Sequence, residues 1–420
     1  MPGEAGNRGS RRRFIRLGTD DSRVGLAAEY AVLGNLAPHS GRVRHPRRRP
    51  VERPDPVAKE SRFMIRPRRL PSCIALICAL TVLPGCWDIK DINHRVLPII
   101  MGISYSKDHK YKVSLQVPVP TARNIRILVV SAEAATLSKA ISHLDMNIES
   151  NLDLTHMQLI LFDRKVAEEG IQDEIAFAMR TQEIPMKALL AVTNEDMESF
   201  LRKTGNSVVQ NGSSFMNFFN KNAGWDPQIT LSALWQAFET IHSETKDIAL
   251  PVIRAGTSTM LEFEGSALMS KDRMVGQIPP EQSLLVNIAN NQIEDAVLEV
   301  TKSSSLLIVR NSTRHRGSIV DGRPVLHTRM QLSAIVKEKH DDKSEDEIAS
   351  ELTEQIRTRY ELLYEKLLKA KSDPTGAGQH FRGLLPYEEL TAWRERYYPR
   401  LILKCDVSTV IVNQGNISSN

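Results

Sequence analysis

Long hydrophobic runs are scarce in this chain of 420 residues. One apolar core, Cys73 to Leu83, stands near the N-terminus and is eleven residues long. At about 1.5 Å per helical residue it is too short to cross a hydrocarbon layer of roughly 30 Å. No run of about 18 apolar residues follows it, so we expect no membrane-spanning helix after it.

Catalytic and cofactor motifs are also missing. The sequence contains no G-x-S-x-G elbow, no H-E-x-x-H pair and no Walker loop. The glycines of Thr375-Gly-Ala-Gly378 follow an expected helix rather than a strand and lack the Lys-Ser/Thr pair of a phosphate loop. His156 has no Cys, Asp or second His at metal or triad spacing, and we expect a structural histidine at a strand edge. We therefore expect no catalytic residue, cofactor or metal ligand, although a triad need not be local in sequence.

Cysteines are too few for a disulfide framework. Beyond residue 85 the chain has two, Cys86 and Cys405. Cys405 stands in the apolar run Leu401-Ile-Leu-Lys-Cys405, and we expect a small core residue there.

The apolar core near the N-terminus has the features of a secretion signal over residues 64–85. Three arginines precede it: Arg66, Arg68 and Arg69. The core ends in Leu83-Pro-Gly-Cys86, which resembles a bacterial lipobox. In that pattern the Cys86 thiol receives a diacylglyceryl group and cleavage makes Cys86 the new N-terminus. The sequence therefore predicts a lipidation site at Cys86.

Residues 1–63 differ in composition from the rest of the chain. They hold fourteen Lys and Arg against seven Asp and Glu, with no sustained apolar period. Such a segment cannot bury a core and is expected to be disordered. Because a secretion signal works at a chain start and Met64 begins a complete one, we expect residues 1–63 to be an upstream extension.

Most of the positive charge lies in these first segments. The whole chain carries +5, of which residues 1–63 contribute +7 and residues 64–85 contribute +3, leaving −5 for residues 86–420. The remaining chain therefore gives no support for nucleic-acid binding. It is long enough for two or three domains.

Residues 87–250 alternate between patterns typical of strands and helices, and we expect one or two subdomains. The expected strands are 96–103, 111–117, 156–162 and 187–192, and the expected helices are 138–148, 165–179 and 229–241. Asn194 is predicted to cap a further helix that ends near Arg202. A surface loop with Phe215, Phe218 and Phe219 is expected over 206–223, and a linker over 242–257. The aromatic residues Trp235 and Phe238 suit either core packing or a partner groove.

Residues 258–417 form the second predicted region. Phe263 to Gly276 is expected to be a hairpin that turns at residues 271–273, followed by a helix from Gln282. Further strands are expected over 293–300, 306–310, 328–336 and 401–412. Between them lies the longest expected helix, 344–371. Its capping box is Ser344 and Glu347, and it carries a stripe of Ile348, Leu352, Ile356, Tyr360, Leu363 and Leu367.

Several short motifs occur in the order found in one known family. They are Gly85-Cys-Trp-Asp88, His156 to Phe162 followed by Ala167-Glu-Glu-Gly-Ile171, Phe263 to Gly276, Asp373-Pro-Thr-Gly-Ala-Gly378, Trp393 and the last strand ending near Gly415. Together they resemble the GerAC, or Ger(x)C, family of spore germination lipoproteins, from Cys86 to Gly415. Gln282-Ser283 departs mildly from the Glu-Ser usual at that point.

The resemblance implies an α+β multidomain lipoprotein, with mixed and antiparallel sheets flanked by helices and with N-terminal and C-terminal GerAC-type regions. It implies a non-enzymatic C subunit of a nutrient germinant receptor, anchored through Cys86 on the outer face of the inner spore membrane. The expected partners are an integral-membrane A subunit and a transporter-like B subunit. A solute-binding lipoprotein that feeds a transporter is the alternative, and a lipoprotein enzyme of the cell wall is a third hypothesis.

Overall fold

The structure is a computed structural model. It describes residues 95–121, 125–211, 228–257, 259–292, 296–301, 304–339 and 342–412. The chain divides into residues 1–86 and a compact unit of residues 87–420, and every described residue belongs to the second. The predicted signal, Cys86 and the three phenylalanines expected in the 206–223 loop lie outside the described residues.

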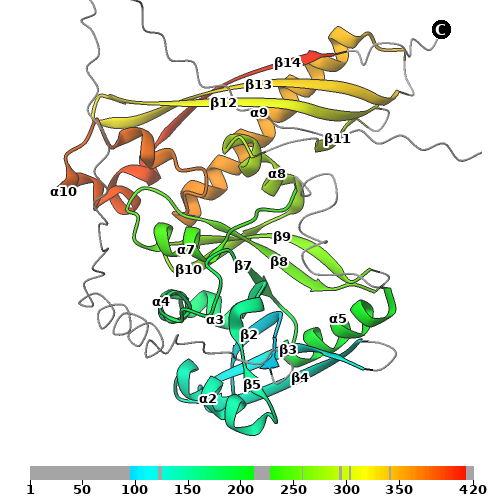
Figure 1. Ribbon diagram of the computed structural model, residues 1–420. Helices are drawn as coiled ribbons and strands as arrows, with labels where there is room; N and C mark the ends of the chain where they lie inside the picture. Colours follow the sequence, from blue (N-terminus) through cyan, green and yellow to red (C-terminus); the bar gives the residue numbers. More distant parts are fainter. Residues whose placement is uncertain are drawn as a thin grey trace, which may run out of the picture. The chain divides into compact units, whose positions relative to one another are not determined.

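The first sheet has eight strands (Figure 1). They are β2 (Ile100–Tyr105), β3 (Tyr111–Pro120), β4 (Ile125–Ala134), β6 (Leu159–Asp163), β7 (Leu189–Thr193), β8 (Ala249–Ala255), β9 (Leu261–Ser270) and β10 (Arg273–Ile278). Their order is β10-β9-β8-β7-β6-β2-β3-β4. Strands β2, β6, β7 and β8 run parallel, while hairpins at both ends add antiparallel partners. Two short strands, β1 (Arg95–Val96) and β5 (Asn151–Leu152), pair separately.

Helices cover both faces of this sheet. They are α2 (Leu137–Asn147), α3 (Arg164–Glu169), α4 (Gln172–Arg180), α5 (Met197–Asn211) and α7 (Leu234–Ile241), with a short 3₁₀ turn η2 (Leu154–His156). One core joins α2, α3, α4 and α7 to side chains such as Met101. The neighbouring residue Ile100 belongs to a different core, under α5. Successive side chains of a strand thus pack against different helix layers, as strand geometry requires.

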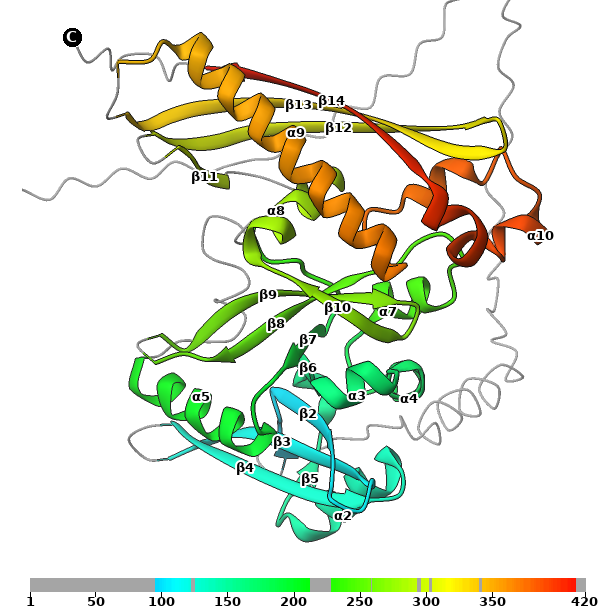
Figure 2. The same cartoon turned by 180° about the vertical axis from the view of Figure 1, so that it is seen from behind.

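The second sheet has four strands in the order β11-β12-β13-β14. They are β11 (Ala296–Thr301), β12 (Ser304–Val320), β13 (Arg323–Lys339) and β14 (Ile402–Ile411), with β14 parallel to β13. Two helices pack on it, α8 (Pro280–Ala289) and α9 (Glu345–Ala370), and α9 crosses in front of the sheet in Figure 2. The segment between α9 and β14 holds η3 (Ala377–Phe381), α10 (Tyr387–Leu390), η4 (Trp393–Tyr397) and η5 (Tyr398–Arg400). The predicted fold class, α+β with mixed sheets flanked by helices, is confirmed.

Helix α9 follows its sequence pattern closely. The Ser344 hydroxyl accepts from the Glu347 amide at 3.3 Å, and the Glu347 carboxylate accepts from the Ser344 amide at 2.7 Å. This reciprocal capping satisfies two donors that the first turn would otherwise leave free. All six predicted stripe residues are buried, and Lys371 ends the helix in the left-handed conformation.

The helix expected over 165–179 is two helices, α3 and α4. Gly170 separates them with φ of 123°, a conformation that only glycine adopts without strain. A Cβ atom there would also lie 2.4 Å from an Asp272 carboxylate oxygen. The apolar residues predicted for the single helix, Val166, Ile171, Ile175 and Ala178, are nevertheless all buried. The pattern located the buried side correctly but gave no sign of the break.

Three further local predictions are wrong. Helix α5 continues to Asn211, past its expected end near Arg202 and into the loop expected over 206–223. The cap of α5 is Asp196, whose carboxylate accepts from the Ser199 amide at 2.9 Å, whereas the predicted cap Asn194 contacts Arg164 and Glu264. Residues 249–255, within the expected linker, form β8 inside the large sheet. That sheet takes its strands from both predicted regions, because β9 and β10 follow residue 258.

Helix α7 starts at Leu234, later than expected, and it buries one side only. Leu234 and Ala237 are fully buried, but Trp235 is 46% exposed and Phe238 is 37% exposed. Core packing therefore does not account for these two aromatic residues.

The two central strands of the second sheet are much longer than expected, whereas β11 and β14 lie close to their expected ranges. Strands β12 and β13 each have 17 residues, and they meet in a two-residue turn of Asp321 and Gly322. Both turn residues have positive φ, 48° and 71°, as in the hairpin turns that Asp-Gly favours.

Candidate functional site

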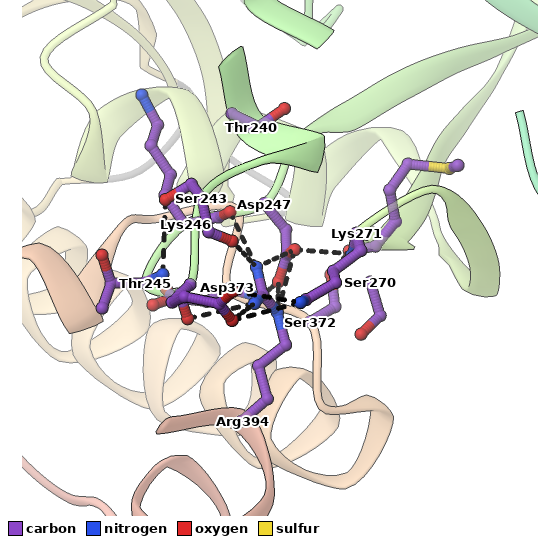
Figure 3. Close-up of polar contacts among 12 residues, drawn as sticks. Thr240, Ser243, Thr245, Lys246, Asp247, Ser270, Lys271, Ser372, Asp373 and Arg394 are labelled. Atoms are coloured by element: carbon purple, nitrogen blue, oxygen red, sulfur yellow. Dashed lines mark hydrogen bonds and ion pairs between the residues drawn. The ribbon is translucent and has the colours of Figure 1, made fainter. Parts of the chain in front are cut away.

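A buried polar cluster joins the two halves of the described chain (Figure 3). Its acidic and basic members are Asp247, Asp373 and Arg394. Asp247 precedes β8 of the first sheet, Asp373 follows α9, and Arg394 lies in η4 before β14. The cluster therefore lies where the long helix of the second sheet ends against the first sheet.

Arg394 is only 8% exposed at its side chain, and its donors all find acceptors on one loop. Its Nη2 donates to the Asp247 carboxylate at 2.7 Å and to the carbonyls of Ser243 and Lys246 at 2.9 and 3.0 Å. Nη1 donates to the Glu244 carbonyl at 3.0 Å. The planar guanidinium thus holds residues 243–247 in a fixed curve, a task for which a lysine has neither the donors nor the geometry.

Asp247 is completely buried and receives donors from three segments. Besides Arg394, its carboxylate accepts from the backbone amides of Lys271 at 2.8 Å and Asp373 at 2.9 Å. Its own amide donates to the Asp373 carbonyl at 2.9 Å. The charge of Asp247 is therefore compensated by one cation and two amides, as a buried carboxylate requires.

The second carboxylate, Asp373, forms no ion pair with any described residue. It accepts from the backbone amides of Ala377 and Gly378, both at 2.8 Å, and from the Thr375 hydroxyl at 3.2 Å. Complete burial raises its pKa to about 6, the two amides oppose the shift, and the nearby charge of Asp247 adds to it. Asp373 therefore organises the following loop as a helix N-cap would.

Close packing explains the glycine in this loop. A Cβ atom at Gly378 would lie 2.6 Å from the Trp393 indole nitrogen and 2.8 Å from the Thr245 carbonyl. The Thr245 hydroxyl in turn accepts from Gln379 at 2.9 Å and Arg382 at 3.2 Å. Gly376, two residues before Gly378, has a positive φ of 65°, in the left-handed region.

Hydrogen bonds of Ser372 and its neighbours extend the same junction. The Ser372 hydroxyl donates to the Met269 carbonyl at 2.6 Å, and the Tyr398 hydroxyl donates to the Ser372 carbonyl at 2.8 Å. The Ser270 hydroxyl donates to the Lys371 carbonyl at 3.0 Å. The end of α9 is thus bonded directly to strand β9. The carboxylate oxygens of the cluster already accept hydrogen bonds from the protein. The arrangement therefore suits a structural link between the two sheets better than a group that reacts with a substrate.

A small hollow of about 180 Å³ lies beside this cluster. Its walls come from α7, α8 and the loop at Pro374, and they include Trp235, Asp247 and Asn287. It is therefore bounded by elements from both halves of the chain, and the exposed Trp235 lies on its wall.

A larger groove of about 550 Å³ lies where β2, β6 and β7 end. Ligands of open α/β sheets commonly bind outside the carboxyl ends of parallel strands. The groove carries both signs of charge, including Lys107, Lys112, Lys165, Glu133, Glu169 and Glu198. Lys112 and Glu198 form an ion pair at 2.9 Å. A groove of this kind suits a small polar solute with charges of both signs.

The other residues singled out in the sequence lie apart from these sites. His156 is exposed in η2, just before β6, with its Nδ1 3.2 Å from the Thr155 hydroxyl. Cys405 is half-buried against the core of the second sheet, and burial raises its pKa to about 12. Over the described ranges, no three His, Cys, Asp or Glu side chains gather in a way that could hold a metal. Nor does any helix there have the length and apolarity needed to cross a bilayer.

Sequence reasoning missed Asp247 and Arg394. Their contact joins positions 147 residues apart, and neither residue stands in a local motif. Asp373 was noticed only as part of a block that ends the long helix. An acidic residue in such a Pro-Gly turn could have indicated that Asp373 accepts hydrogen bonds from the following backbone amides, because carboxylates cap turns and helix starts.

In the described residues, fold and site define an α+β protein whose two larger sheets are tied together by a buried ionic cluster. Two family models match this chain in sequence. Residues 88–255 match the spore germination protein N-terminal domain, and residues 264–415 match the spore germination B3/GerAC-like C-terminal domain. The chain belongs to the GerAC family of spore germination proteins.

Curated relatives cover most of the same length. The chain is 19% identical over 362 residues to spore germination protein B3 of Bacillus subtilis, covering 80% of this chain and 96% of that protein. It is 21% identical over 399 residues to spore germination protein KC of the same organism, covering 83% and 96%. A solved structure, the crystal structure of the GerBC protein, shares 16% identity with a TM-score of 0.49, covering 74% of this chain and 97% of that one.

Proposed function

We propose that this protein is the lipid-anchored C subunit of a spore nutrient germinant receptor and that it acts without catalysis. One observation carries the proposal: both GerAC family models match, in order, over residues 88–255 and 264–415. The first match begins two residues after Cys86, where the mature chain of a lipoprotein would start. The signal and lipobox pattern of residues 64–86 supports an anchor at that cysteine.

The partners in this proposal are an integral-membrane A subunit and a B subunit with transporter-like character. The protein would lie on the outer face of the inner spore membrane, held by the diacylglyceryl group on Cys86. A body built of two sheets tied by the Asp247–Arg394 cluster suits a rigid subunit that completes a complex. The domain division into residues 87–250 and 258–417 remains a prediction. The boundary between these two regions falls within one sheet, since β8, β9 and β10 are neighbouring strands of the first sheet.

The test is deletion of the gene, followed by germination assays on purified spores. Spores without the protein should form normally, lose the fall in optical density with one class of nutrient, and still germinate by routes that bypass receptors. Deletion of the gene for either membrane partner should give the same defect, and restoring the gene should repair it. A deletion strain without a second receptor that still responds to every amino acid and sugar would exclude the proposed role.

A solute-binding lipoprotein is the alternative function, and the groove at the ends of β2, β6 and β7 favours it. Its volume of about 550 Å³ and its mixed charges would accept an amino acid. Isothermal titration of residues 87–420 with amino acids separates the two functions. A binding protein should bind its solute without partners. Heat of binding that disappears in Lys165→Ala, but not in the distant surface variant Lys187→Ala, would favour the alternative.

A further inference from the structure

The face of the second sheet that points away from α9 is basic. Side chains of β12–β14 alternate between two faces, and Thr313, Thr328 and Met330 lie on the buried one. Figures 1 and 2 show α9 on one side of the sheet and no helix of the described residues on the opposite side. The exposed cations on that opposite side, here called the basic face, are Arg310, Arg314, Arg316, Arg329 and Lys404.

The register places like charges directly beside each other. Arg314 pairs with Arg329 in the antiparallel ladder, and in the adjacent row Arg316, His327 and Lys404 are neighbours. Like charges directly opposite one another destabilise a sheet. Asp406, beside Arg329, is the one acidic residue in these rows. Within the described part of the chain, none of the five cations of the basic face has an ion-pair partner.

This arrangement contrasts with the rest of the mature chain. Residues 86–420 carry a net charge of −5, yet five cations gather on three strands. Unpaired cations aligned across strands do not stabilise the folded state, because each repels the next. Their arrangement therefore indicates an anionic surface that would neutralise them.

The shape of the face indicates which anionic surface. Neighbouring strands lie about 4.8 Å apart and alternate residues about 7 Å apart, so the cations form a shallow two-dimensional array. Guanidinium groups bind phosphate oxygens in a bidentate manner. At the β12–β13 turn, Ile319 and Val320 are 38% and 51% exposed beside Arg323. Apolar side chains next to cations suit the boundary between lipid headgroups and acyl chains.

We infer that the basic face binds the surface of an anionic phospholipid bilayer through lipid phosphate groups. The inference rests on the membrane location proposed above. It adds a second, electrostatic attachment to the lipid at Cys86, on a part of the chain distant in sequence. An acidic segment of a partner protein would satisfy the same charges, but it would make no use of the exposed apolar turn.

Sedimentation with vesicles tests the inference, using residues 87–420, which form one compact unit and lack the lipidated cysteine. The protein should sediment with vesicles of phosphatidylglycerol and phosphatidylcholine at about 0.1 M salt. It should stay in solution with pure phosphatidylcholine, or when about 0.5 M salt screens the charges. Arg329→Gln should lower the partition coefficient about fivefold, the change that ~1 kcal/mol per basic residue gives.

The single variant Arg314→Glu separates binding from folding. It replaces a repulsive cross-strand pair by an attractive one, so its melting temperature should equal or exceed that of the parent while its vesicle binding falls more than that of Arg329→Gln. A matched control, Lys139→Glu, makes the same change of charge at an exposed lysine outside the second sheet and should bind vesicles at most slightly less well.

Three results would overturn the inference. They are no sedimentation with phosphatidylglycerol vesicles, equal losses in the control and in Arg314→Glu, and binding of soluble polyglutamate in place of vesicles, which would assign the face to an acidic partner. None of these results would change the outcome expected in the germination assay on deletion spores. The failure of this inference and the failure of the proposed function are therefore distinguishable.

Discussion

At the residue scale, Arg394 is the side chain whose loss should matter most for folding. Arg394→Ala would leave Asp247 buried without its cation and would free three backbone carbonyls. Breaking a buried pair in this way costs about 3–5 kcal/mol. Chemical denaturation of residues 87–420 should show that loss.

Two further variants make the Arg394 prediction specific. Arg394→Lys should recover only part of the stability, because an ammonium cannot reproduce the planar set of donors. The exposed neighbour Arg396, which lies over the Tyr397 ring, is the matched control, and Arg396→Ala should cost less than about 1 kcal/mol. Equal losses in Arg394→Ala and Arg396→Ala would show that the cluster is not a major support of the fold.

The raised pKa of Asp373 predicts that the stability of the protein depends on pH. The folded pKa of about 6 lies above the ordinary 3.8, so the folded state holds this proton more tightly than the unfolded chain. The stability that Asp373 contributes is therefore fully present below about pH 4 and is lost as the pH rises through about 6. The difference in unfolding free energy between the parent and Asp373→Asn should shrink by up to about 3 kcal/mol over that interval. A difference that stays constant from pH 4 to pH 7 would contradict the raised pKa.

At the scale of elements, α9 is the support of the second sheet. Ile356 is 1% exposed in the middle of its buried stripe. Ile356→Asp would place an unpaired carboxylate in the core and should cost several kcal/mol, enough to unfold the C-terminal half. The exposed position Thr358 on the same helix is the control, and Thr358→Asp should change the melting transition little. An unchanged transition in Ile356→Asp would show that the stripe is not needed for folding.

Elements with a strong local period could be predicted, and those decided by single residues or distant contacts could not. The apolar spacing of α9 and its capping box fixed both its start and its buried side. The hairpin of β9 and β10 was expected from the polar turn at residues 271–273. The Asp321-Gly322 turn is a strong hairpin signal, but the segment before it, residues 310–318, is polar on both faces and shows no alternation typical of a strand.

The candidate site was harder to predict than the fold for a physical reason. Periodicity reports which side of an element is buried, but it does not report which buried polar groups meet. Asp247 stands just before an unrecognised strand, and its partner Arg394 lies in a π-helical turn 147 residues away. Only the folded register brings Asp247 and Arg394 together, so no local pattern could pair them.

At the scale of the whole molecule, the proposals give the protein two attachments to the membrane with different chemistry. The diacylglyceryl group on Cys86 would hold by apolar burial, at about 0.8 kcal/mol per buried methylene, and would be insensitive to salt. The basic face would hold by charge and would be weakened as salt shortens the screening length. Cells that express the full chain allow the two attachments to be separated by washing membranes.

Cys86→Ala should move the protein from a salt-resistant to a salt-sensitive membrane fraction. The parent should remain in the pellet after a wash at about 1 M salt, because two acyl chains anchor it stably. Cys86→Ala should be released by that wash but partly retained at about 0.1 M salt, where the Debye length is about 10 Å. Adding Arg314→Glu and Arg329→Gln to Cys86→Ala should release the protein at low salt as well, whereas adding Lys139→Glu and Lys187→Glu should not. If Cys86→Ala stays in the pellet after the 1 M wash, contacts with membrane partners hold the protein, and the lipid at Cys86 is not its main anchor.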